Sequence, residues 1–553
     1  MSATTMKKAT SMNRLLPIVA MAAGLMITAA AQAAAPGISG PSFTLTAQPA
    51  YLSQPDGQAV YSWGYGCTTP PAAASFVPAT STAPFCNTMQ VPGPTLVVTE
   101  GQTVSVTLSN GLPTAAGNTS ILFPGFNVTT SGGVPGLLTQ EAAPGSTVTY
   151  TFTASTPGTR SYYSGTQSDL QVEMGLYGAI IVLPNAAPSN GSCPAHNTAA
   201  GVDSTTNQLT AGGENDFRLS PTGAAFHLTQ SCYDREYLFQ FSEMDPNIHN
   251  QALAQVAASA AACTAGGAGS AGCGLNVPTE PYPPAYFMIN GRSMPDDMDT
   301  NYAAQYPHLP YNGNPHMHPG EMVLLRIIGQ GRWQHPFHEH GNHVRILARD
   351  GNLIVSSTSA TQLAGPLLFT TTTTPGVAMD GIFYWTGKGL NWDAYGHTPA
   401  SQDPTAKLAC APDANGYNTG APTAINYFEW CQDHEKPLQV APFGDVAGGG
   451  PATLPDANIF TNGAWYGGSP YLGPNATVRA TGCSAGSPAG SCGSTGTTPP
   501  SGTIANSPSG EAGFAFMWHS HNEREITTNN IFPGGMLMMM LVDSREFVID
   551  ETN

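Results

Sequence analysis

Charged residues are scarce in this chain, and basic residues are the scarcest. Lysine and arginine number 17 against 35 aspartate and glutamate, and the four types together make up 9% of the 553 residues. A net charge of −18 disfavours binding to phosphate backbones and anionic membrane surfaces, so nucleic acid is not expected as a partner. Apolar residues still reach 41%, which is enough for folded cores and argues against a disordered chain.

Long apolar runs are lacking beyond the N-terminus. Basic residues precede the apolar segment 15–31, and the small-residue sequence Ala31-Gln32-Ala33 ends it. This order is typical of a secretory signal peptide, so we expect residues 1–33 to be removed. The mature chain then keeps no membrane span, and we expect it to be exported to the periplasm, the cell surface or the medium.

Helical periodicity is nearly absent. Apolar and polar residues alternate over 94–110, 145–152 and 320–328, as in strands with one buried face. The 62 glycines and 48 prolines supply turns between such strands. An alanine-rich stretch, 251–262, is the exception and is expected to form a short helix. We therefore predict an all-β fold, and about 520 mature residues are too many for one core.

The ten cysteines of an exported chain predict five disulfides. They occur as neighbours in loop-like stretches, where a local ring restrains the unfolded chain. The sequence does not fix the connectivity, but it favours sequential pairing, which leaves no thiol free to bind metal. The favoured pairs are Cys67–Cys86, Cys193–Cys232, Cys263–Cys273, Cys410–Cys431 and Cys483–Cys492.

Several segments carry a resemblance to a known family. Gly93-Pro94-Thr95-Leu96, the sequence GVPGLLTQ at 133–140 and LQVEMGLYG at 170–178 resemble the first cupredoxin domain of laccase-like multicopper oxidases. The sequence YFMING at 286–291 is similar to the end of that family's middle domain. The histidine-rich segments near 335 and 519 are similar to its last domain.

The resemblance implies an architecture and a domain layout. Three cupredoxin-like Greek-key β-sandwich domains would follow one another over residues 34–188, 189–318 and 319–553. The third would be unusually long, and its extra length lies in 398–423 and 467–510, which are rich in Gly, Pro, Ser and Thr and contain cysteines. We interpret both as disulfide-stapled surface loops.

Two histidine motifs are the strongest chemical signals. His338 and His340 lie two residues apart in HPFHEHG, and so do His519 and His521 in WHSH. Such side chains project from one face of a strand, and imidazole suits copper and also zinc. In the family that the chain resembles, the first histidine of HPFHEHG, here His335, serves type 1 copper, and the others serve type 2 and type 3 copper. All five are therefore predicted metal ligands.

The chain departs from the family at other ligand positions. Ser520 stands where the family has the type 1 cysteine, and Glu525 where it has a second type 1 histidine. In the first domain, SILFPG at 120–125 replaces His-Trp-His-Gly, and YYSGT at 162–166 replaces Tyr-His-Ser-His. A serine hydroxyl is a poor ligand for this soft position, so no blue copper centre is expected. The remaining histidines are expected to hold about one copper ion, and at most two, where the third domain meets the first.

Three functions are open for such a protein. It is either a copper-dependent oxidoreductase that acts on a small molecule or a metal ion, or a copper-free structural or interaction module of the cell envelope, or a protein that stores or delivers copper. His316, His318 and the methionine-rich segment 536–540 would be auxiliary sites in the last case. Glu339 and Glu523 flank the histidine motifs and would either orient imidazole N–H groups or be solvated.

Overall fold

The computed structural model describes residues 35–78, 85–193, 202–203, 208–209, 216–388, 412–419, 430, 432, 469–472, 504–505, 512–543 and 549. Strands dominate this part of the chain, so the all-β prediction is confirmed. No helix within it is both long and apolar enough to cross a membrane. The expected signal segment, 1–33, lies outside the described residues.

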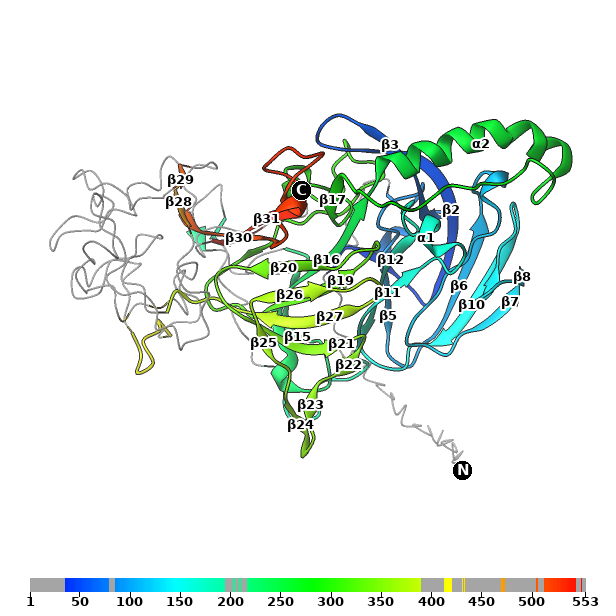
Figure 1. The fold of residues 1–553 in the computed structure, drawn as a ribbon. Coiled ribbons are helices and arrows are strands. Elements are labelled where there is room, and N and C mark those ends of the chain that lie inside the picture. The colour runs from blue at the N-terminus through cyan, green and yellow to red at the C-terminus, as the bar shows by residue number, and fades with distance from the viewer. Residues whose placement is uncertain are drawn as a thin grey trace, which may run out of the picture.

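The N-terminal part folds into a sandwich of two five-stranded sheets (Figure 1). One sheet consists, in order, of β11 (Gly158–Tyr163), β12 (Tyr177–Leu183), β5 (Leu96–Thr99), β1 (Gly37–Ser39) and β4 (Phe76–Val77). The other consists, in order, of β3 (Ala59–Cys67), β2 (Ser42–Ser53), β6 (Thr103–Asn110), β10 (Thr147–Thr153) and β7 (Thr129–Gly132). A ribbon of β8 (Val134–Pro135) and β9 (Gln140–Glu141) and the one-turn helix α1 (Ser168–Gln171) complete it.

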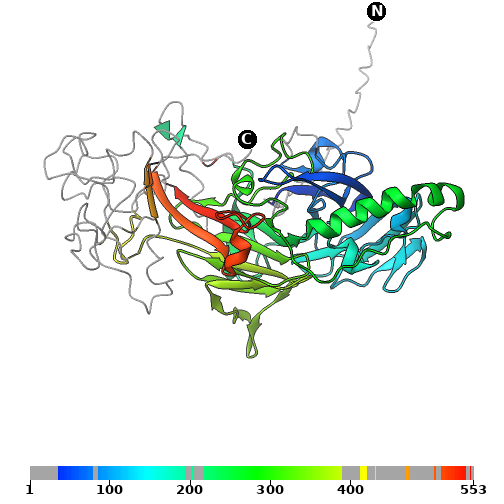
Figure 2. The ribbon, with the colours of Figure 1, turned by 45° about the horizontal axis from the view of Figure 1, so that its top comes forward.

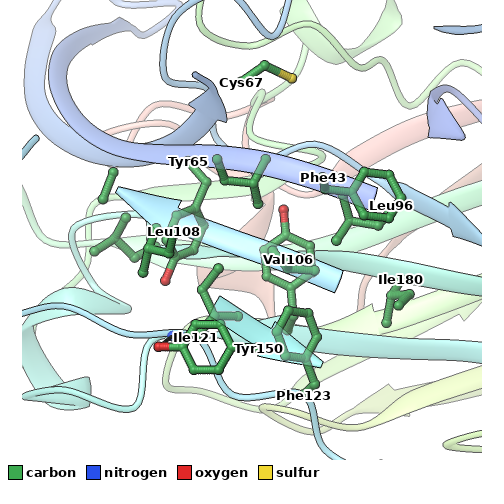
Figure 3. Packing of buried hydrophobic residues seen from close by; sticks show 14 of the residues in the cluster. Phe43, Tyr65, Cys67, Leu96, Val106, Leu108, Ile121, Phe123, Tyr150 and Ile180 are labelled. Carbon is green, nitrogen blue, oxygen red and sulfur yellow. Dashed lines mark hydrogen bonds between the residues drawn. The ribbon is translucent and has the colours of Figure 1, made fainter. Parts of the chain in front are cut away.

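The apolar faces of these two sheets meet in one buried core (Figure 3). Val104, Val106 and Leu108 take every second position of β6 and are buried, as the alternating pattern predicts. They share this core with Leu96 and Ile180 of the other sheet. Burying each aliphatic side chain of this size stabilises the fold by about 1.5–3 kcal/mol.

A second sandwich follows, with a larger pair of sheets. Its inner sheet consists, in order, of β15 (Leu219–Ala224), β16 (Cys232–Met244), β19 (Val323–Gly329), β27 (Ala378–Phe383), β21 (Val344–Arg349) and β22 (Asn352–Leu353), with β17 (Tyr286–Ile289) beside β16 and β25 (Leu367–Leu368) beside β21. Its outer sheet consists of β18 (His316–Met317), β31 (Leu537–Asp543), β30 (Ala512–Ser520), β20 (His335–Glu339) and β26 (Thr370–Thr373), with β28 (Ser469–Leu472) and β29 (Ile504–Ala505) beyond β30. The ribbons β13 (Val202–Asp203) with β14 (Gln208–Leu209) and β23 (Val355–Ser356) with β24 (Ser359–Leu363) stand apart.

The expected domain boundary near residue 318 does not separate two sheets in the described part of the chain. Strand β16 lies before it and β19 after it, and the two pair in parallel from Arg235 with Val323 to Phe241 with Gly329. Only β15, β16, β17 and β18 among the described strands of the second sandwich precede 318, too few to enclose a core of their own. They complete sheets whose other strands come from the expected third domain, so the described strands form two sandwiches.

The sheet of the first sandwich that contains β5 and β12 packs against the inner sheet of the second sandwich. Val97 and Ile181 of the first sandwich are buried against Leu238, Ile328 and Ala378 of the second. The outer sheet, with β20 and β30, packs on the opposite face of the inner sheet. It therefore lies on the far side of the inner sheet from the contact between the sandwiches.

A buried ion cluster ties the sandwiches together. Thr159 of β11 donates its hydroxyl to Asp380 of β27, and Arg326 of β19 donates to the same carboxylate at 3.0 Å and to Glu236 at 2.6 Å. Breaking such a buried pair leaves an uncompensated charge and is strongly destabilising. The two sandwiches are thus held in a fixed relation by polar as well as apolar contacts.

Helix α2 (Pro246–Gly266) is longer than the alanine-rich stretch predicted. The side chain of Asp245 accepts from the backbone N–H of Asn247, Pro246 starts the helix, and Gly267 ends it with a φ of 75°. Figure 2 shows this helix lying across the first sandwich. Its residues Ile248 and Ala252 are buried in the core of that sandwich.

Three of the predicted disulfides are confirmed. Cys67 bonds to Cys86, Cys193 to Cys232 and Cys263 to Cys273, each with its neighbour in the sequence. The other two predicted pairs, Cys410–Cys431 and Cys483–Cys492, lie outside the described residues. Short 3₁₀ turns occur at Ala73–Ser75, Thr114–Ala116, Thr229–Ser231, Asp296–Met298 and Glu523–Ile526.

Candidate metal centre

The two histidine motifs lie side by side because β20 and β30 pair antiparallel. The register sets His338 opposite His519, and residues that face each other in such a pair share one face of the sheet. His340 and His521 lie two residues further on and follow the same alternation. The backbone N–H of His521 donates to the carbonyl of Pro336 at 2.8 Å, which holds the second motif against the first beyond the last paired residue.

The four imidazole rings form one cluster. The ring centroid of His338 lies 4.8 Å from that of His340, 5.1 Å from His521 and 5.6 Å from His519. The Nε2 atoms of His340 and His519 are 3.3 Å apart. Within the described residues, however, no group of three or more His, Cys, Asp or Glu side chains has its donor atoms in a ready-made geometry for one ion. The sequence named these four histidines but did not show that they converge, and coordination itself stays a proposal.

Neighbouring groups orient these rings. His519 donates Nδ1–H to the carbonyl oxygen of Ser520 at 2.7 Å, which leaves its Nε2 with the lone pair. Nδ1 of His338 is 2.9 Å from the hydroxyl of Thr370 on β26. Trp518 donates Nε1–H to the carbonyl of His340 at 2.9 Å. Fixing the ring orientation in this way is what supporting residues do at metal sites.

Three of the four histidines in the cluster have a lowered pKa. Burial, together with the neighbouring imidazoles, lowers the pKa of His338 to about 4 and that of His340 to about 3. Burial also lowers the pKa of His519. A neutral imidazole is the form that binds metal, so these rings can offer their lone pairs at neutral pH without first losing a proton.

His335 lies in a different environment, on the core side of the same strand. Its Nδ1 is 2.8 Å from a carboxylate oxygen of Glu525, and its Nε2 is 2.8 Å from one of Glu243. Burial would lower the pKa of this imidazole, but the two carboxylates outweigh it and raise the pKa to about 9. Both nitrogens therefore carry protons at neutral pH. In this state neither nitrogen offers a lone pair to a metal, and the ligand role of His335 stays a prediction.

The position of the family's type 1 copper is thus filled by an ion cluster. Ser520 donates its hydroxyl to the same oxygen of Glu525 that accepts from His335. All three side chains, and that of Glu243, are buried. The sequence indicated the substitutions at Ser520 and Glu525, but it gave no sign of Glu243, which precedes His335 by 92 positions. A blue copper centre does not fit these residues.

The first-domain positions of the missing ligands also lie together. Leu122 and Tyr163 are paired across a bridge, and the hydroxyl of Ser120 accepts from the backbone N–H of Gly165 at 3.1 Å. A side chain at Gly165 would collide with Leu122, since its Cβ would lie 2.8 Å from the Cγ atom of that leucine. Ser120 and Thr166 are linked hydroxyl to hydroxyl at 2.9 Å. Thr166 in turn donates its hydroxyl to Glu141 at 2.8 Å, so apolar packing and hydroxyl hydrogen bonds take the place of imidazoles here.

The weaker candidates take structural positions. Nδ1 of His316 lies 2.7 Å from the carboxylate of Asp543, and Nδ1 of His318 lies 2.8 Å from the carbonyl of the same residue, so both hold the end of β31. Glu339 is buried, which raises its pKa to about 8, and accepts from Thr371.

Met536, Met538 and Met540 are buried in the core of the second sandwich. Glu523 is exposed, and its carboxylate lies 3.9 Å from Nδ1 of His521.

The described contacts of the four histidines come from the second sandwich. Thr370, Trp518, Ser520 and the ring of Phe369 surround them, and the inner sheet separates their strands from the first sandwich. The expectation that the site lies where the third domain meets the first stays a prediction.

This fold and site define a cupredoxin-like β protein with an imidazole cluster, and comparisons with known proteins agree. A family model described as multicopper oxidase matches residues 73–187. Laccase-3 of Botryotinia fuckeliana is 30% identical over 196 residues, which are 28% of this chain and 43% of that protein. Laccase 1 of Metarhizium acridum is 37% identical over 98 residues, 17% of this chain and 15% of that protein.

These alignments span less than half the length of either laccase. The solved structure of a blue copper oxidase from Nitrosomonas europaea is 14% identical and covers 90% of this chain and 85% of its own, with a TM-score of 0.42. The chain is therefore similar to multicopper oxidases, as its motifs predicted.

Proposed function

We propose that the chain is an exported copper protein whose one site is formed by His338, His340, His519 and His521, and that it acts as an oxidoreductase without type 1 copper. The observation that carries this proposal is the convergence of four imidazoles from two paired strands, three of them with a lowered pKa. The Nε2 atoms of His340 and His519, 3.3 Å apart, fit a shared cation because neither ring needs to lose a proton.

Copper bound there would supply one-electron redox chemistry. The chain's own residues would hold and shield the site: Thr370 and the Ser520 carbonyl fix two rings, and Phe369 packs edge-on against the ring of His338 at 5.7 Å. Since Ser520 replaces the thiolate, a small-molecule or metal-ion substrate would have to reach the site directly. Phe369 is 46% exposed and the side chain of His521 is 47% exposed, which leaves such an approach open.

Export is part of the same proposal. The three disulfides support it, because such bonds persist in oxidising compartments outside the cytoplasm. Copper storage is less favoured, because Nδ1 of His316 and Nδ1 of His318 are both engaged with Asp543.

A copper-free envelope module is the second candidate, favoured by the loss of the first-domain ligands at Ser120, Leu122, Tyr163 and Gly165. Metal analysis of protein purified without added copper separates the two. We expect about one copper per chain, with zinc able to replace it, as imidazole ligands allow. Protein that contains no metal and takes up neither copper nor zinc on addition would favour the module.

A further inference from the structure

A continuous series of hydrogen-bonding side chains begins beneath the second histidine pair. Ser520 lies between His519 and His521 in the sequence, and its hydroxyl donates to Glu525. The same carboxylate oxygen accepts from Nδ1 of His335 at 2.8 Å, and Nε2 of His335 reaches Glu243 at 2.8 Å. Three ionisable groups thus follow one another without a gap on the core side of β20 and β30.

The series continues towards the first sandwich. The second carboxylate oxygen of Glu243 lies 3.4 Å from the hydroxyl of Tyr282, which donates to Glu173 at 2.5 Å. Glu173 follows α1 in the first sandwich, so Tyr282 joins acidic residues of both sandwiches. The other carboxylate oxygen of Glu173 lies 3.6 Å from Nε2 of His249 in α2.

The surroundings keep this series in place. Backbone N–H groups of Arg332 and Trp333 donate to Glu243, and that of Asp245 donates to Glu173. The guanidinium of Arg332 lies 4.1 Å from the ring centroid of Tyr282, whose side chain is partly exposed. The ionisable members from Glu525 to Glu173 are otherwise buried. Burying charges costs free energy, and an apolar core of the same volume would be as stable or more so, so packing alone does not account for the series.

We propose that the side chains from Glu525 through His335, Glu243 and Tyr282 to Glu173 form a proton path between the underside of the histidine site and the contact between the two sandwiches. The purpose we assign to it rests on the proposed function. Adding a cation to the histidine site disfavours a second positive charge at His335, which lies three residues along the strand from His338, on the order of 10 Å away. A proton that leaves His335 for Glu173 removes that charge.

The transfer balances group by group. His335 gives its Nε2 proton to Glu243, so an N–H bond breaks, an O–H bond forms, and imidazolium and carboxylate become imidazole and carboxylic acid. The protonated carboxyl group of Glu243 then rotates to turn its hydroxyl towards Tyr282, and it passes this proton to the tyrosine oxygen as the tyrosine's own hydrogen moves to Glu173. One proton has moved from His335 to Glu173, and the return runs through the same bonds. Burial raises the pKa of Glu173, which suits it as an acceptor.

The path is tested without metal, by the exchange of the His335 ring protons with solvent in the full chain. NMR of protein labelled with 15N at histidine follows the exchange, and His335→Gln assigns the signals. We expect Tyr282→Phe to slow exchange of the Nε2 proton at least about tenfold, because exchange then requires local opening of the structure. The matched control is Tyr286→Phe, because the hydroxyl of Tyr286 binds Asp56 outside the series. In this control variant the His335 Nε2 proton should exchange at the wild-type rate.

Glu173→Gln gives a second break in the path, at its far end, in case Tyr282→Phe fails to fold. Exchange at the wild-type rate in either folded variant, or equal slowing in the Tyr286→Phe control, would overturn the path. Copper calorimetry on the same proteins reports on the proposed function separately. Copper binding with unchanged exchange refutes the path alone, and slowed exchange without any copper binding refutes the copper site alone.

Discussion

The two faces of the β20–β30 pair place the same kind of side chain in opposite states. On one face, His338 is packed among other imidazoles, and burial lowers its pKa to about 4. On the other, His335 lies between Glu243 and Glu525, and its pKa is raised to about 9. These two histidines, three residues apart, thus differ because one pairs with two carboxylates and the other is buried beside imidazoles. The local charge, more than the motif, therefore sets the protonation state of each imidazole.

The largest expected effect comes from removing the imidazolium group of His335. His335→Leu would leave the carboxylates of Glu243 and Glu525 buried without their cation, and we expect the unfolding free energy to fall by about 3–5 kcal/mol. Denaturant unfolding measures the change. His227→Leu serves as the control, because His227 pairs with Glu100 at the surface and its loss should cost under about 1 kcal/mol. A cost as small for His335→Leu would show that its ion cluster is not stabilising.

The pH dependence of stability should carry the signature of His335. Its folded pKa of about 9 lies above the unfolded value near 6.5, so the stabilisation is fully present below pH 6.5 and is lost as the pH rises through 9. This loss should amount to about 3 kcal/mol. In the double variant Glu243→Gln with Glu525→Gln the pKa of His335 is no longer raised, and the decrease between pH 6.5 and 9 should be smaller by that amount. Identical pH profiles for the two proteins would contradict the assignment.

The smallest expected effect concerns Ser520. Ser520→Cys restores the family's thiol but leaves Glu525 in the place of a histidine and His335 without a lone pair. We therefore expect no intense blue absorption when copper is added to this variant, and a copper affinity close to that of the wild type. Strong thiolate-to-copper absorption would mean that His335 releases its carboxylates to bind copper.

Much of this fold could be predicted from residue patterns. Alternation of apolar residues located β6 and β10, and the His-x-His spacing placed each histidine pair on one face of its strand. The three disulfides followed from the cysteine spacing, since the partners of each are at most 39 residues apart in the sequence. These features depend on neighbours in the sequence, which is why no structure was needed to find them.

Contacts between distant segments could not be predicted in this way. The parallel pairing of β16 with β19 joins strands about 90 residues apart. These strands lie on opposite sides of the domain boundary expected near residue 318. The pairing of His335 with Glu243 depends on the same sheet, because β16 brings Glu243 beneath β20. The resemblance therefore assigned His335 to copper, whereas only the three-dimensional arrangement shows the carboxylates that protonate it.

The central claim is that copper binds on the four-histidine face and not on the His335 face. Calorimetric titration of demetallated protein with copper tests it in two double variants, one for each face. We expect His340→Ala with His521→Ala to abolish high-affinity binding, and Glu243→Gln with Glu525→Gln to bind about one copper with an affinity close to that of the wild type. Unchanged binding in the first variant, together with loss of binding in the second, would contradict the account.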